Sequence, residues 1–271
     1  MIVGAPALRL LSVAACMLLL GCSPASTSRV TAPRLALSLA YADDAAALVR
    51  LLSQRYSAQQ VGLDFDLSSD SHAALMTHLR TGQLSYFITP HLEPQVGLWA
   101  APLAQDGLVL VVHPQNPLND LSLDDARRLY QGYIRRWQEL GGRPVDVRLL
   151  SREEGSAARL TFEARLLGTR RLSANAQLVS SLDNLRRVIQ DDEGAIGYLL
   201  YSQLSAGLKP LALDGVLPSQ ASISSGAYPL TLTVYIVGRG EPEGELRQFL
   251  GWVQSAAGQA VLSDCCAPLP R

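Results

Sequence analysis

Short apolar segments alternate with amphipathic segments along the chain from residue 34 onward. Apolar runs bounded by polar turns predict strands, whereas apolar residues spaced three or four apart predict helices. The strands predicted in this way are residues 35–40, 61–67, 84–89, 108–113, 145–150, 195–200 and 230–238. The predicted helices cover 45–56, a segment ending at Gly82, segments opening at 121–125 and at 156, then 182–190 and 243–256. This alternation predicts an α/β fold.

Polar residues stand at the junctions between several of these strands and helices. Asp43 and Asp44 precede the helix at 45–56, residues 68–71 form a Ser/Asp turn before the next helix, and residues 152–156 precede a later one. Such residues are typical helix caps. Because they follow strands, several helix N-termini are expected at the carboxyl ends of the sheet, where open α/β sheets bind ligands.

The first residues have the pattern of a secretion signal. Arg9 is followed by an apolar run over 10–20, and Leu19–Cys22 (LLGC) ends it. The run is too short for a membrane-spanning helix, which needs about twenty residues. The tetrapeptide resembles a bacterial lipobox, which implies removal of residues 1–21, a lipid on Cys22 and a polar tether over 22–31. An ordinary signal peptide cut nearby is the alternative.

Composition bounds the class of protein. The 271 residues are 48% hydrophobic and 17% charged, enough for more than one compact domain. The formal net charge of −1 provides no overall field for holding nucleic acid or an anionic membrane surface. No nucleic-acid partner is predicted.

Two adjacent cysteines, Cys265 and Cys266, are the thiols left once the signal and Cys22 are set aside. In an oxidising compartment they could pair. Neighbouring Cα atoms lie about 3.8 Å apart, below the usual disulfide range of about 4.4–6.8 Å, so the ring would be strained. Unpaired or intermolecularly paired thiols are the alternative. No metal site is predicted, because no histidine stands beside the pair.

Several segments in the second half together resemble one protein family. They are residues 102–117 (PLAQDGLVLVVHPQNP), 121–123 (LSL), 130–132 (YQG), 137–141 (WQELG), 152–156 (REEGS), 193–198 (EGAIGY) and 228–230 (YPL). In this order and spacing they resemble the phosphate-binding solute-binding proteins of bacterial ABC importers.

The resemblance implies a two-lobed periplasmic-binding-protein-like fold with two crossings, near 104–107 and near 222–229. Lobe I would combine residues 32–104 with 225–271, and lobe II would be residues 105–224. Phosphate or a related oxyanion would lie in the cleft, and closure of the hinge would report occupancy to a membrane permease. The protein would then be extracytoplasmic and held to a membrane by the lipid on Cys22.

The resemblance also implies site residues in lobe II. Arg152 would supply a bidentate guanidinium and Ser156 a hydroxyl, followed by the backbone N–H groups of Ala157 and Ala158. The family usually has Gly-Thr where this chain has Ala157-Ala158, so one hydroxyl is lost. A salt bridge from Arg152 to the neighbouring acidic residues 153–154 and a plain helix cap at Ser156 are the structural alternatives.

Lobe I departs further from the family pattern. The family's first loop is rich in Gly, Ser and Thr, whereas here Asp43 and Asp44 would repel a dianion. Asp43 is carried as a ligand-binding candidate, with capping of the following helix as the alternative.

The remaining lobe I candidates are serines. Ser69 and Ser71 are matched to hydroxyls of the family's second loop. Ser85 stands where the family commonly has an Asp that accepts the proton of hydrogen phosphate. With Ser85 the basis for choosing phosphate over sulfate is lost, unless a carboxylate supplies the acceptor from another direction.

Two other classes of function compete with solute binding. A secreted enzyme is not favoured, because the chain has no Gly-x-Ser-x-Gly elbow and no P-loop, and His72 and His78 lack the i, i+4 metal spacing. No catalytic residue and no cofactor is predicted. The altered lobe I loops favour a second alternative: a binding-protein-like lipoprotein that acts as a sensor, an assembly factor or a binder of another small solute.

Overall fold

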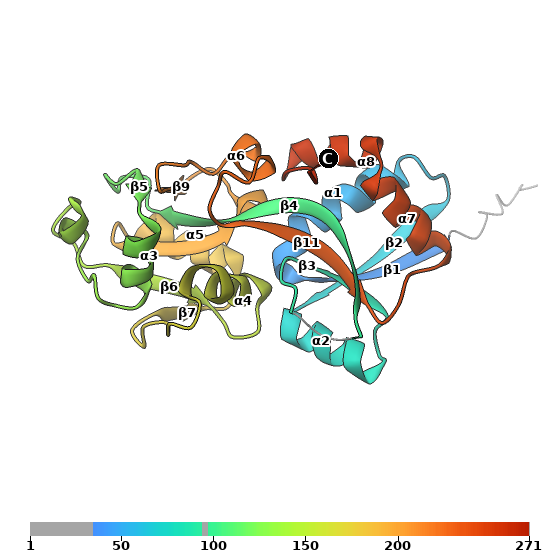
Figure 1. Ribbon diagram of the computed structural model, residues 1–271, viewed down its shortest axis with the longest axis horizontal. Helices are drawn as coiled ribbons and strands as arrows, with labels where there is room; N and C mark the ends of the chain where they lie inside the picture. The colour runs from blue at the N-terminus through green and yellow to red at the C-terminus, as the bar shows by residue number, and fades with distance from the viewer. Residues whose placement is uncertain (1–34, 94–96, 271) are drawn as a thin grey trace, which may run out of the picture. The chain divides into compact units, whose positions relative to one another are not determined.

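A mixed sheet with strand order β2-β1-β3-β11-β4-β8-β6-β7, and β9 paired to β4, forms the framework of the protein (Figure 1). The computed structural model describes residues 35–93 and 97–270, which belong to one compact unit spanning 33–271. The signal, lipobox and tether predicted for residues 1–31 lie outside the described residues. The α/β prediction is confirmed.

The elements occur in a strand-helix alternation along the chain. The strands are β1 (Leu35–Ala42), β2 (Leu63–Asp70), β3 (Tyr86–Thr89), β4 (Trp99–Val112), β5 (Asp120–Leu121), β6 (Arg148–Arg152), β7 (Gln177–Val179), β8 (Ala195–Leu200), β9 (Lys209–Pro210), β10 (Ala212–Leu213) and β11 (Thr231–Gly238). The α-helices are α1 (Ala46–Ser57), α2 (His72–Thr81), α3 (Leu123–Tyr130), α4 (Ala157–Phe162), α5 (Leu182–Asp191), α6 (Gln220–Ser224), α7 (Gly244–Gln254) and α8 (Ala256–Val261). Short 3-10 turns, η1 (Asp43–Ala45) and η4 (Tyr201–Gln203), follow β1 and β8.

Strand β4 joins the two lobes of the fold. Its first part, 99–107, pairs antiparallel with β11, and its second part, 108–112, pairs antiparallel with β8. Figure 1 shows β4 and β11 running side by side as they pass between the two groups of elements. We call the group containing β1–β3 the first lobe and the group containing β6–β8 the second lobe.

The core forms where the sequence is most continuously apolar. Each residue of the 108–112 segment is fully buried, and every residue of β8 is buried. Strands covered on both faces have this composition, because neither face meets water. The apolar runs therefore predicted β8 and the second part of β4, whereas they did not predict the first part of β4, 99–107, as a strand.

Two local predictions need correction. Strand β2 continues through residues 68–70, because these pair in register with residues 40–42 of β1, so only Ser71 remains as a cap before α2. The closing helix expected at 243–256 ends at Gln254. Ser255 is extended there, with ψ 165°, and its side chain accepts a hydrogen bond from Gly258 N–H to cap α8 instead.

The part of the chain that the structure describes contains no helix long and apolar enough to cross a membrane. Cys265 and Cys266 are unpaired thiols whose Sγ atoms lie 2.8 Å apart. Cys266 is buried, and the Cys265 thiol together with burial raises its pKa well above the usual value. Its thiol form is therefore favoured.

Candidate functional site

An ion pair between Asp44 and Arg152 joins the two lobes. Asp44 lies in η1 after β1, and Arg152 is the last residue of β6. Arg152 Nη1 donates to Asp44 Oδ1 over 3.1 Å, and the two residues are only 4% and 1% exposed. Arg152 also lies 4.0 Å from the Glu153 carboxylate, which is its weaker acidic contact.

The amino end of α4 supplies the second donor to the same carboxylate. Ser156 is the N-cap of α4, and its hydroxyl accepts from Arg159 N–H. The Ala158 backbone N–H then donates to Asp44 Oδ2 over 2.9 Å. A guanidinium and a helix N-terminal amide are the donors that proteins use for oxyanions. Here they hold a carboxylate of the protein itself.

The electrostatic environment of Asp44 is a balance between burial and pairing. Burial raises the pKa of the carboxyl, while the Arg152 guanidinium and the Ala158 N–H oppose that rise. The neighbouring Asp43 adds a smaller increase by like-charge repulsion. Burial outweighs the paired donors, so the pKa of Asp44 is raised overall, although the donors limit the rise.

The backbone of Arg152 is held by a polar network in the second lobe. Its N–H donates to the Tyr198 hydroxyl over 3.1 Å, and its carbonyl accepts from Arg159 Nη1 over 3.1 Å. Tyr198 stacks on Phe162 of α4 with ring centroids 4.1 Å apart. Burial raises the pKa of Tyr198 to about 12, so it stays a neutral hydroxyl. These contacts fix the donors before any ligand arrives.

Two further contacts join the lobes beside the ion pair. The Ala73 N–H in the first turn of α2 donates to the Gly155 carbonyl over 3.1 Å, and Gln203 Nε2 of η4 donates to the Asp44 carbonyl over 3.1 Å. Gly155 has φ +85°, and a Cβ there would lie 2.8 Å from the Ala73 Cβ. The close approach therefore requires glycine at this position.

A pair of histidines lies on another part of the boundary between the lobes. His72 Nδ1 and Thr89 Oγ1 are 2.8 Å apart, and His91 Nδ1 lies 3.4 Å from Thr161 Oγ1 of α4. Burial lowers the pKa of His72 to about 4, so its imidazole is neutral at pH 7. Within the described ranges, 35–93 and 97–270, no group of three His, Cys, Asp or Glu side chains could hold a metal ion.

Comparison with known families identifies the fold. The model of the PBP superfamily domain matches residues 86–257, which is more than half of the chain and includes Arg152 and Ser156. The chain belongs to the PBP superfamily.

Relatives within the PBP superfamily include a phosphate-binding protein PstS from Bacillus subtilis (strain 168), 31% identical over 150 residues, or 55% of this chain and 50% of that protein. The chain spans about half the length of the curated relatives it matches. Among solved structures, a phosphate ABC transporter substrate-binding protein from Clostridium perfringens with bound phosphate matches with TM-score 0.78 at 23% identity, covering 84% of this chain and 97% of that one. An ABC-type phosphate transport receptor from Vibrio cholerae matches with TM-score 0.70 at 21% identity, with the same two coverages.

These matches confirm the resemblance and the two-lobed PBP fold that the sequence motifs indicated. The structure brings four of the candidate residues together in one buried group: Arg152, Ser156, Ala157 and Ala158. The capping interpretation of Ser156 is confirmed by its bond from Arg159 N–H. The cap uses one acceptor lone pair and leaves the hydroxyl proton to donate elsewhere, so the assignment of Ser156 to the ligand site stays a prediction.

Asp43 and Ser69 lie elsewhere. Both are exposed, and both line an opening of about 310 Å³ that is also lined by Gln203, the residue that donates to the Asp44 carbonyl. Of the two acidic residues in the first loop, Asp44 is the one that reaches the donors. The expectation that this pair caps the following helix is wrong, because Ala45 is the N-cap of α1 and makes no side-chain cap.

The other two serines differ in their places: Ser71 begins the helix whose Ala73 N–H contacts Gly155, whereas Ser85 lies at the opposite end of the sheet. Ser71 is the N-cap of α2 and accepts from Ala74 N–H. Ser85 is exposed and precedes β3, which runs parallel to β1 with Phe87 beside Ala40. Ser85 is therefore at the amino end of the strand, whereas Asp44 follows the carboxyl end of its neighbour. Its assignment to the ligand site is corrected accordingly.

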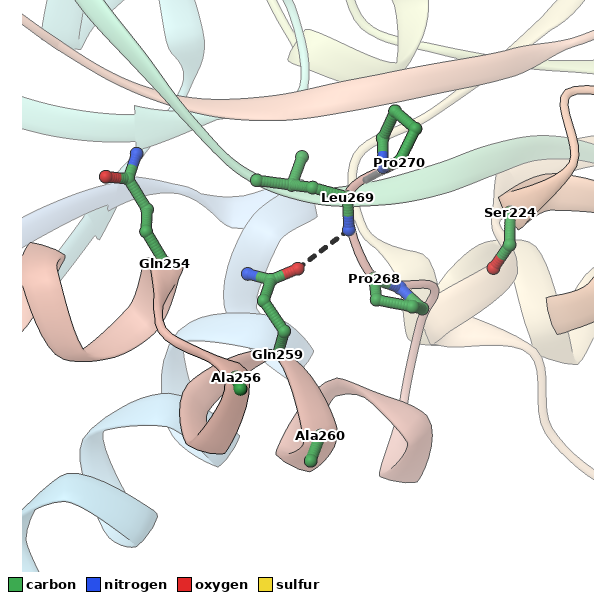
Figure 2. A pocket seen from close by; sticks show the side chains of 8 residues that line it. All are labelled: Ser224, Gln254, Ala256, Gln259, Ala260, Pro268, Leu269 and Pro270. Atoms are coloured by element: carbon green, nitrogen blue, oxygen red, sulfur yellow. Dashed lines mark hydrogen bonds between the residues drawn. The ribbon is translucent and has the colours of Figure 1, made fainter.

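A different cavity of about 840 Å³ lies between α6, α8 and the C-terminal tail (Figure 2). Figure 2 shows Gln259 of α8 accepting from the Leu269 N–H across this cavity. Its lining residues are Ser224, Gln254, Ala256, Gln259, Ala260, Pro268, Leu269 and Pro270. None of these is charged, so the cavity offers no counter-charge to an oxyanion.

Sequence reasoning missed two features of the site. The pairing of Asp44 with Arg152 spans 108 positions, so local pattern could not reveal it. Gln203 looks like an ordinary polar residue after a strand, yet it is buried and bonds to Asp44. The first-loop carboxylates at an expected anion site were the signal that could have indicated an internal partner for Arg152.

Proposed function

We propose that this protein is a solute-binding protein that holds a small oxyanion, with phosphate as the first candidate, between its two lobes. The observation that carries the proposal is the donor set of Arg152 and the Ala158 N–H, which meets an anionic group at the boundary of the lobes. Phosphate is chosen because the relatives are phosphate-binding proteins.

The proposed partner is a membrane permease of an ABC importer. Support comes from the solved structures that share the fold, one a phosphate ABC transporter substrate-binding protein and another an ABC-type phosphate transport receptor. The proposal includes an extracytoplasmic location with a lipid on Cys22. We further propose residues 32–104 with 225–271 as one lobe and 105–224 as the other, and no catalytic activity.

A second candidate function is favoured by one specific observation. The Asp44 carboxylate already occupies the donors that an oxyanion would use. A protein with that arrangement could keep the PBP fold and act as a sensor, an assembly factor or a binder of another small solute. Binding of free oxyanions separates the two candidates.

The test is titration calorimetry of the full chain with phosphate, sulfate and arsenate. The proposal expects phosphate binding that Arg152→Ala removes, because the guanidinium is the charged donor of the site. Arg128→Ala is the matched control, since Arg128 lies on the exposed surface of α3 in the same lobe. It should bind phosphate as the unaltered protein does.

Unchanged phosphate affinity in Arg152→Ala would show that Arg152 does not bind phosphate. Absence of binding to every oxyanion, in the unaltered protein and in variants that free the donors, would favour the second candidate. A bound ligand should also raise the free energy of unfolding, by about 2.7 kcal/mol at a concentration one hundred times its dissociation constant. A thermal shift series gives an independent check on the calorimetry.

A further inference from the structure

The Asp44 carboxylate makes the contacts that an oxyanion makes with an anion-binding loop. One oxygen accepts from Arg152 Nη1 over 3.1 Å and the other accepts from the Ala158 N–H over 2.9 Å. Both donors belong to the second lobe, while Asp44 belongs to the first. The carboxylate therefore bridges the cleft between lobes, as a free ligand of a two-lobed binding protein would.

The arrangement is not explained by local helix chemistry. Asp44 stands two residues before α1, where an acidic side chain ordinarily caps its own helix, yet α1 has no side-chain cap. The carboxylate is instead directed to a helix of the other lobe. Its backbone carbonyl is also held across the boundary, by Gln203 Nε2 over 3.1 Å.

The donors have little capacity left for a second anion while Asp44 is present. Asp44 is 1% exposed and Arg152 is 4% exposed. An oxyanion accepting from Arg152 Nη1 and the Ala158 N–H would need the volume that the carboxylate fills. The anion and the side chain therefore compete for one site.

One donor of this site is unused. Arg152 Nε is buried and, among the described residues, has no hydrogen-bond partner. A guanidinium can donate along two edges to an anion, and an orphaned buried donor is costly. A tetrahedral oxyanion has more acceptor atoms than a carboxylate and could satisfy Nε together with Nη. The site thus has a donor that its present occupant does not use.

We propose that Asp44 is an internal ligand that holds the lobes closed in the absence of solute and that an oxyanion binds only by displacing it. This inference rests on the proposed function for the nature of the external ligand. Asp44 then sets the threshold of solute concentration, because binding must first break its contacts with Arg152 and Ala158. Replacing it with the hydroxyl typical of the family's first loop removes that competitor.

The experiment compares the full-length unaltered protein with Asp44→Ser. Calorimetry with inorganic phosphate should show at least tenfold tighter binding in Asp44→Ser. Small-angle scattering without phosphate should give a larger radius of gyration for Asp44→Ser than for the unaltered protein, and phosphate should restore the smaller value. Asp44→Asn, which keeps the shape and removes the charge, serves if Asp44→Ser fails to fold.

Asp124→Ser is the matched control, because it removes one exposed carboxylate from the first turn of α3. It should leave phosphate affinity and the radius of gyration as they are in the unaltered protein. Equal phosphate affinity and equal dimensions in the unaltered protein and Asp44→Ser would overturn the internal-ligand proposal, while the proposed function would stand.

If neither protein binds phosphate but Asp44→Ser is expanded, internal closure holds and phosphate binding fails. If neither binds phosphate and their dimensions are equal, both proposals fail. Affinity and dimensions together thus separate the two claims.

Discussion

Two buried carboxylates, Asp44 between the lobes and Asp106 on the connecting strand β4, are treated differently by the fold. Each is 1% exposed, and burial raises the pKa of both. At Asp44 the Arg152 guanidinium opposes this rise in pKa. Asp106 is instead held by neutral donors, among them the N–H groups of Gly107 over 2.7 Å and Ser202 over 3.2 Å, which donate to its Oδ1.

The difference shows that a charged donor stabilises the buried Asp44 carboxylate, whereas neutral N–H dipoles stabilise that of Asp106. Burial of a lone carboxylate favours its neutral form, and the pKa of Asp106 accordingly rises to about 6. Asp44 instead accepts from a guanidinium and a helix N-terminal N–H, which are donors that proteins use for oxyanions. Its burial therefore depends on a contact between lobes, whereas that of Asp106 depends on turns around the crossing.

The short turn η4 contacts the Asp106 carboxylate and the backbone carbonyl of Asp44. Ser202 N–H donates to Asp106, and the next residue, Gln203, donates to the Asp44 carbonyl. Two adjacent residues of this turn thus contact the connecting strand β4 and Asp44 of the ion pair. The effect of substituting either aspartate on the free energy of unfolding can therefore be compared with the effect of substituting the other.

The largest effect is expected from breaking the ion pair. Arg152→Ala and Asp44→Ala should each lower the free energy of unfolding by about 3 kcal/mol, because removing one partner strands a buried charge. The double variant should lose little more than either single one, since no stranded charge remains. Denaturant unfolding of the four proteins measures this coupling.

Additive losses in that cycle would mean that the two side chains act independently. Lys209→Ala tests whether loss of any partly buried cation has the same effect, since Lys209 Nζ donates to the Asn116 carbonyl away from the ion pair. It should show no coupling to Asp44→Ala.

A smaller effect is expected at Asp106, and it depends on pH. A carboxyl with a raised pKa contributes stability that is fully present below its unfolded value, 3.8, and is lost as the pH rises through about 6. Asp106→Asn keeps an acceptor oxygen for Gly107 and Ser202 but cannot ionise. Between pH 4 and pH 7, the unaltered protein should therefore lose about 2 kcal/mol relative to Asp106→Asn.

Unfolding measured for both proteins across this range tests the prediction. Taking the difference between them cancels His72, whose lowered pKa of about 4 acts with the opposite sign. A constant difference in the free energy of unfolding from pH 4 to pH 7 would mean that burial does not raise the pKa of Asp106.

The smallest effect concerns the cap that orients the donors to Asp44. Ser156→Ala should lower the free energy of unfolding by about 1 kcal/mol, because the N-cap bond to Arg159 N–H is lost. Ser71→Ala, which removes the cap of α2, should cost a similar amount. Only Ser156→Ala should weaken coupling between Asp44 and Arg152, as measured by the double-variant cycle. Equal coupling in both cap variants would show that the cap does not orient the site.

Much of the fold could be predicted because its central strands are apolar on both faces. The 195–200 strand matches β8, and the segment at 108–112 lies in the buried half of β4. Strand β2 was predicted less well. It is at one end of the strand order and carries exposed polar residues at 68–70, which resemble a turn when read locally.

The candidate site, like the fold, could be predicted only in part. Arg152 and Ser156 could be located because they stand in one short motif at the junction of a strand and a helix. The part played by Asp44 could not, because its partners lie more than 100 positions away and a local reading favours capping of the next helix. Its true partner is a helix end as well, but in the other lobe.

A crystal structure of the full-length protein, purified in buffer free of phosphate and carboxylate, tests the central claim most directly. We predict closed lobes with the Asp44 carboxylate on Arg152 Nη1 and the Ala158 N–H, and no separate anion between them. An open cleft with Asp44 in solvent, or an anion bound to Arg152 while Asp44 keeps its contacts with Arg152 Nη1 and the Ala158 N–H, would contradict the internal-ligand account.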